Sequence, residues 1–175
     1  RRQRQMCIRD SNEAIEEYEI AMQKLHKVSD SEKLQEKVLI QLIPTLIRMG
    51  RMDEAKAHLD QMEQMNDYQH SRFIENIFQA YYYLHNNDMD KVRKYIQEAE
   101  EWYEYYPFYF HSSILKYIQA EYAKRIGDDE LAIKLYNELT INTSSANVYN
   151  RYLKMKNSLA QLYTKQNRPR EACAI

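Results

Sequence analysis

The chain has 175 residues, with 25 Lys and Arg against 26 Asp and Glu and a net charge of −1 with histidine neutral. This balance, with both signs interspersed, argues against general binding to a phosphate backbone. No stretch of about 18 apolar residues is present, so the sequence predicts no membrane span. Two glycines and three prolines, among abundant Glu, Lys, Gln, Leu and Ala, predict helix almost throughout.

The first 11 residues, RRQRQMCIRDS, have two interpretations. Their four arginines would suit a basic arm that contacts nucleic acid or an anionic membrane. The same stretch also matches the in-frame translation of a common transposase-type sequencing adaptor, completely from Arg1 to Asp10 and compatibly at Ser11. We interpret residues 1–11 as adaptor-derived and exclude them from the fold prediction. Without them the net charge is about −4 and Cys173 is the remaining cysteine, so we expect neither an intrachain disulfide nor a cysteine-based metal site.

The remaining chain contains similar segments at intervals of 37 to 41 residues. Four of them begin with a residue that readily adopts the left-handed conformation at a helix C-terminus. These residues are Gly50, Asn87, Gly127 and Asn167. Five positions later in each segment lies a small apolar residue that we expect at a helix–helix contact. These residues are Ala55, Val92, Ala132 and Ala172, with Ala14 in a fifth segment that begins at Asn12.

The helices expected before these turns also carry mostly small residues in one register. Seven positions before each turn residue lie Ile43, Ala80, Ala120 and Ala160. The pattern therefore predicts an all-α array of antiparallel helix pairs, each pair joined by a tight turn. Residues 12–175 would form one repeat domain, with units at 12–28 (the second helix of a partial unit), 31–66, 71–105, 108–141 and 146–175. The last unit keeps few residues after Pro169, and a helix that short is not stable alone, so we expect an array truncated at both ends.

Units built from a small residue, a turn, a GxxxEA-like segment and an apolar or aromatic residue resemble tetratricopeptide repeats. The resemblance implies a right-handed superhelical α-solenoid. The usual repeat is about 34 residues, and here the extra residues fall between units, in MNDYQHSRF, YYPFYFHSS and INTSSANVYNRY. The aromatic residue expected early in each first helix is missing, with Leu39, Asn76, Lys116 and Lys156 in its place. A related family of longer helical repeats is the alternative.

No motif in the sequence predicts catalysis. There is no GxSxG segment, Gly-rich phosphate loop or Cys/His pair, and the five histidines lack the spacing of metal ligands. We therefore predict a protein that is not an enzyme and that needs no cofactor or metal. The tyrosine-rich stretches FQAYYYLHNN and EWYEYYPFYFHSS predict packing between helices, with an aromatic platform for a partner as the alternative.

The resemblance implies a non-catalytic scaffold that binds a protein or peptide segment, or an adjoining domain of the same chain, and no nucleic acid. In this family the concave groove is lined by the first helix of each pair. Carried over onto this sequence, the candidate groove residues are Ile77, Tyr81, Leu84 and His85 in one unit, Tyr117, Glu121, Lys124 and Arg125 in the next, and Asn157, Gln161 and Lys165 in the last.

An alternative hypothesis makes this segment the sensor or coupling region of a larger bacterial signalling protein. Divergent repeats rich in Tyr and Asn are similar to those that precede bacterial sensor histidine kinases and to those of DNA-binding regulators with a helix-turn-helix. The output domain would then lie outside the segment. A third hypothesis is a repeat accessory to an enzyme complex. A cytoplasmic location is favoured, with which the cysteine content is compatible, and the periplasm is the alternative if the segment is part of a membrane sensor.

Overall fold

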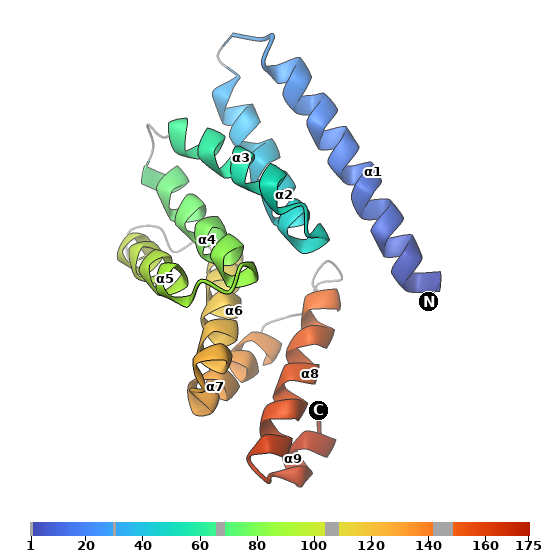
Figure 1. The fold of residues 1–175 in the computed structure, drawn as a ribbon, viewed down its shortest axis with the longest axis vertical. Helices are drawn as coiled ribbons and strands as arrows, with labels where there is room; N and C mark the ends of the chain where they lie inside the picture. Colours follow the sequence, from blue (N-terminus) through green and yellow to red (C-terminus); the bar gives the residue numbers. More distant parts are fainter. Residues whose placement is uncertain (1, 30, 66–68, 104–108, 142–148) are drawn as a thin grey trace. The chain divides into compact units, whose positions relative to one another are not determined.

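The computed structural model describes residues 2–29, 31–65, 69–103, 109–141 and 149–175, with side chains at 10–29, 31–65, 72–103, 112–140 and 152–175. These residues contain nine helices and no strand (Figure 1). The helices are α1 (Arg2–Leu25), α2 (Glu32–Met49), α3 (Met52–Gln64), α4 (Gln69–His85), α5 (Met89–Tyr103), α6 (Tyr109–Ile126), α7 (Asp129–Ile141), α8 (Tyr149–Lys165) and α9 (Pro169–Cys173). The all-α prediction is confirmed, and the superhelical arrangement stays a prediction.

All four predicted turn residues adopt the left-handed conformation. Their φ angles are 78° at Gly50, 60° at Asn87, 85° at Gly127 and 57° at Asn167. In each turn the next residue donates its backbone N–H to the carbonyl five residues earlier in the chain, as from Arg51 to Leu46 at 3.0 Å. The equivalent distances are 3.0 Å after Asn87, 2.9 Å after Gly127 and 2.8 Å after Asn167. This hydrogen bond satisfies a carbonyl that the helix end would otherwise leave free.

The helices after these turns begin in two different ways. At α5 and α7 the side chain of an aspartate caps the helix: Asp88 Oδ1 accepts the Lys91 N–H at 3.3 Å, and Asp128 Oδ1 accepts the Leu131 N–H at 3.1 Å. At α3 no side chain caps the helix, and an ion pair lies at the helix start instead. The Arg51 guanidinium binds the Glu54 carboxylate and lowers the pKa of that carboxyl. Arg168 and Glu171 form the same pair at α9, at 3.0 Å.

The small residues of the central pairs lie in the core as predicted. Ala55, Val92 and Ala132 are fully buried in the second helices, as are Ile43, Ala80 and Ala120 in the first helices. The prediction was wrong for Ala14, Ala160 and Ala172, which are only half-buried. The helix paired with α8 is α9, which spans 5 residues and so covers little of the α8 surface.

The chain divides into two compact units, Arg1–Pro107 and Phe108–Ile175, which we call the N-terminal and C-terminal units. In the N-terminal unit each helix packs against the next, and α2 also packs against α4. Its core includes Leu42 and Ile47 of α2, Leu59 of α3 and Phe78 of α4. In the C-terminal unit α7 packs against both α6 and α8, and α8 packs against α9.

Helix α1 continues through the stretch that matches the adaptor, since it begins at Arg2. The side chains of residues 1–9 lie outside the described part, so the prediction that they make no native packing is not tested. Much of the predicted inter-unit stretches (66–68, 104–108 and 142–148) also lies outside it. Of the helices described, none combines the length and apolar character needed to cross a membrane.

Candidate functional site

In the N-terminal unit, the four groove candidates divide between core and surface. Ile77 and Leu84 of α4 are buried, at 0% and 2% exposure, so they contribute to packing and not to an accessible surface. Tyr81 is half-buried and His85 is exposed. The two rings meet edge to face, with centroids 4.9 Å apart. The accessible candidates of this unit are therefore one aromatic pair at the C-terminal end of α4.

In the C-terminal unit, the α6 candidates Tyr117 and Glu121 lie close to the core. Tyr117 is buried, and the half-buried Glu121 accepts a hydrogen bond from the hydroxyl of Tyr136 in α7, with the two oxygens 2.5 Å apart. Burial of Tyr136 raises the pKa of its phenol well above the ordinary value, and the negative charge of Glu121 raises it further. The phenol therefore stays neutral and acts as a hydrogen-bond donor that fixes the Glu121 carboxylate.

Lys124 connects the first helices of two successive pairs. Its Nζ donates to Ser158 Oγ at 3.0 Å and to Gln161 Oε1 at 3.4 Å, so α6 contributes the donor and α8 both acceptors. Ser158 is buried, with 6% of its surface exposed. Two groove candidates that lie 37 residues apart in the sequence thus contact each other directly.

The other candidates on α6 and α8 are exposed polar side chains. They are Arg125, Asn157, Gln161 and Lys165. Lys165 Nζ pairs with Asp129 Oδ2 of α7 at 2.5 Å. Together with Glu121 and Lys124, these side chains make up what we call the α6–α8 surface. Three of its six side chains are basic and one, Glu121, is acidic. The amides of Asn157 and Gln161 both donate and accept hydrogen bonds.

Two side chains that organise this surface, Tyr136 and Ser158, were not among the candidates predicted from the sequence. Tyr136 lies four residues after the small residue Ala132, on the same face of the helix. This position predicts a buried tyrosine but does not indicate that its hydroxyl bonds to Glu121. Ser158 had no distinguishing pattern. Both act on candidates that come from a different helix, and the sequence of a single helix does not contain that pairing.

The tyrosines of α4 and α5 form a packed cluster. The rings of Tyr83 and Tyr95 stack with centroids 5.5 Å apart and planes 3° from parallel, and Tyr82 meets Tyr83 edge to face at 5.2 Å. Lys91 Nζ lies 4.5 Å from the centre of the Tyr83 ring. Burial raises the pKa of Tyr95 above its ordinary value. The contacts of Tyr83 with Tyr95 and Lys91 lie between the two helices of one pair, as the packing interpretation predicts.

Among the residues described, no group of three or more His, Cys, Asp or Glu side chains is arranged to hold a metal ion. Comparisons of the chain with protein-family models, with curated protein sequences and with solved structures give no match.

Proposed function

We propose that the protein is a non-catalytic helical scaffold that binds a protein or peptide segment, and that the α6–α8 surface is a binding site. The contact from Lys124 to Ser158 and Gln161 carries this proposal. Two first helices can share one surface only if their side chains reach one another. The bonds from Lys124 of α6 to two side chains of α8 meet this condition.

The chemistry of the α6–α8 surface indicates what kind of segment would bind. Lys124 and Arg125 supply charged donors, and Asn157 and Gln161 supply amides that both donate and accept. An extended peptide offers backbone carbonyl and N–H groups to such amides, and an acidic side chain or a C-terminal carboxylate to the cations. A polar peptide with at least one carboxylate is therefore the favoured ligand.

Glu121 is already oriented for such a role, because the buried Tyr136 hydroxyl holds one of its oxygens. A side chain that is fixed before binding loses less conformational entropy when the ligand arrives. The expected contribution of Glu121 is selectivity: it would repel a ligand carboxylate placed next to it and accept an N–H or a basic side chain instead.

The proposal is tested with peptides selected from a displayed random library against the immobilised protein. The affinity of a selected peptide is measured by fluorescence anisotropy for the wild type and for Asn157→Ala and Gln161→Ala. Both side chains are exposed, so the variants should fold normally, and we expect the Kd to rise about fivefold or more for at least one of them.

Lys134→Ala is the matched control, because Lys134 is an exposed side chain on α7 of the same unit. Its affinity for the selected peptide should stay within about twofold of the wild type. The proposal fails if no selected peptide distinguishes the protein from an unrelated helical protein. It also fails if the selected peptides bind the Asn157→Ala, Gln161→Ala double variant as tightly as the wild type.

A further inference from the structure

Two charged side chains of the α6–α8 surface, Glu121 and Lys124, are held by buried hydroxyl groups. Lys124 Nζ donates to Ser158 Oγ at 3.0 Å, and the Tyr136 hydroxyl donates to Glu121 Oε1 at 2.5 Å. Tyr136 is fully buried and Ser158 is 6% exposed. These two side chains are also hydrogen-bonded to each other. A continuous chain of hydrogen bonds therefore joins the ammonium group to the carboxylate.

The two ends fix the direction of this chain of hydrogen bonds. An ammonium group only donates hydrogen bonds, and an ionised carboxylate only accepts them. Ser158 accepts from Lys124, so its own hydrogen is available for the phenol oxygen of Tyr136, and the phenol hydrogen goes to Glu121. Both charged groups are thus held in place by neutral hydroxyl groups, and each keeps its charge for a ligand.

The two charges are spaced to suit a peptide in extended conformation. Glu121 and Lys124 are three residues apart on α6, so their Cβ atoms lie about 5–6 Å apart on one face of the helix. In an extended peptide, alternate side chains point to the same side, about 6.5–7 Å apart. A basic and an acidic side chain two residues apart in a ligand can therefore reach Glu121 and Lys124 at the same time.

We propose that the α6–α8 surface selects an extended peptide with an acidic and a basic side chain two residues apart, the acid paired with Lys124 and the base with Glu121. This inference rests on the proposed function, because it specifies the ligand of the same surface. Tyr136 and Ser158 are positioning residues that act through Glu121 and Lys124. Two acids or two bases at these ligand positions would bring like charges together and weaken binding.

The sequences of the peptides selected from the displayed library give the first test. Among peptides that bind the full chain, pairs of one acidic and one basic residue two positions apart should be enriched about threefold or more over the starting library. Pairs of two acids or two bases at the same spacing should not be enriched. This readout uses the wild-type chain alone, so it tests the proposal even if a variant does not fold.

A double-mutant cycle tests each contact separately. Glu121→Gln removes the charge and keeps an oxygen that accepts from Tyr136, and Lys124→Gln removes the charge and keeps N–H donors for Ser158. The best selected peptide is also made with its base or its acid replaced by glutamine. Replacing the peptide base should weaken binding to the wild type about threefold or more beyond its effect on Glu121→Gln, and the peptide acid should couple likewise to Lys124. The crossed combinations should show no favourable coupling.

Tyr136→Phe tests the positioning role. The variant loses the donor that fixes Glu121, whereas Lys124 keeps Ser158 as an acceptor. The coupling between the peptide base and Glu121 should therefore fall below about twofold, and the coupling between the peptide acid and Lys124 should persist. A general loss of structure would reduce both couplings together, and circular dichroism verifies that the variant keeps its helical content.

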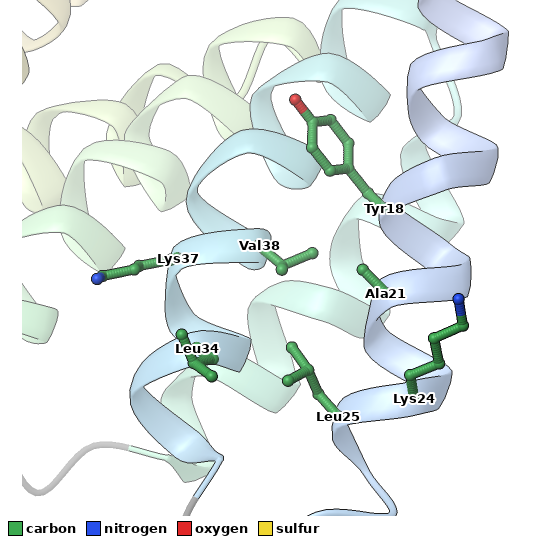
Figure 2. Close-up of a pocket in the computed structure, with 7 residues that line it drawn as sticks. All are labelled: Tyr18, Ala21, Lys24, Leu25, Leu34, Lys37 and Val38. Atoms are coloured by element: carbon green, nitrogen blue, oxygen red, sulfur yellow. The ribbon is translucent and has the colours of Figure 1, made fainter.

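The N-terminal unit offers a competing place for a peptide, an open apolar pocket of about 410 Å³ between α1 and α2 (Figure 2). Leu34 in its lining is 51% exposed. None of the residues that line the pocket is acidic, so it provides no partner for the base of the ligand. Lys37→Gln is the matched control for Lys124→Gln, because Lys37 is a lysine of this pocket, and the affinity should stay within about twofold of the wild type.

Two results would overturn this proposal. One is a set of selected peptides without enrichment of acid–base pairs two residues apart, and the other is the absence of coupling between the peptide base and Glu121. If Asn157→Ala or Gln161→Ala still weakens binding in either case, the proposed function stands and only the paired-charge ligand is refuted. If no selected peptide depends on the α6–α8 surface, both proposals fail.

Discussion

Replacing Tyr136 with Phe removes one oxygen atom and leaves the fully buried ring in place. The lost interactions are the hydrogen bond to the Glu121 carboxylate, at 2.5 Å, and a hydrogen bond with the Ser158 side chain. Hydrogen bonds to charged acceptors contribute about 1.5–3 kcal/mol. Glu121 is only half-buried, so water can replace the phenol at its oxygen in the variant. We therefore expect the free energy of unfolding to fall by about 1–2 kcal/mol at neutral pH.

The difference between the two proteins should depend on pH in the alkaline range. Burial and the neighbouring carboxylate raise the pKa of Tyr136 in the folded chain, whereas in the unfolded chain it titrates near the ordinary value of about 10. Below that pH the stabilisation is complete. Above it the unfolded chain loses the proton and the folded chain keeps it, so the advantage of Tyr over Phe falls by about 1.4 kcal/mol per pH unit.

Urea unfolding followed by far-UV circular dichroism, from about pH 8 to about pH 11, measures both effects. The other tyrosines titrate equally in the two proteins, so their contribution cancels in the difference. Tyr122→Phe is the control, because Tyr122 is half-buried on α6 of the same unit, and it should change stability by less than about 0.5 kcal/mol. An unchanged stability for Tyr136→Phe, or a difference that stays constant across the pH range, would refute the reasoning.

Three other predictions concern the fold. Gly127→Ala should lower the free energy of unfolding by about 1 kcal/mol, because alanine is strained in the left-handed conformation even though its Cβ would have no neighbour within 4 Å. Gly127→Asn should lower it less, and equal urea midpoints for the two variants would contradict this. Ala120→Leu inserts a larger side chain at a fully buried position and should cost about 1–3 kcal/mol, so normal thermal melting would mean that the repeat register is wrong. Deletion of residues 1–11 should leave the Tm unchanged within error, and a loss above about 2 kcal/mol would show that they contribute to the core.

The turns were the most predictable part of the fold. Gly50, Asn87, Gly127 and Asn167 were recognised because few residue types tolerate a positive φ, and the structure places all four there. This preference is local, so the sequence carries it without help from tertiary contacts. The small residues of the central pairs, such as Ala55 and Ala120, were predictable for a similar reason, since a close helix crossing favours small side chains.

The candidate site was less predictable than the fold. Ile77, Leu84 and Tyr117 were assigned to the groove from the position that the resemblance gives them, yet their side chains are buried. Which face of a first helix remains accessible depends on where its neighbours pack, and that is not encoded in the helix itself.

The packing of consecutive helices also has a consequence for how quickly the chain folds. Within each unit, nearly all helix contacts join neighbours along the chain, and α2 with α4 spans one intervening helix. Little loop entropy is lost in forming such contacts, and helical proteins with short-range contacts fold on a timescale of about microseconds to milliseconds. We expect a helix pair closed by a left-handed turn, such as α4–α5 around Asn87, to form early, with α3, α2 and α1 packing onto it in turn within the N-terminal unit.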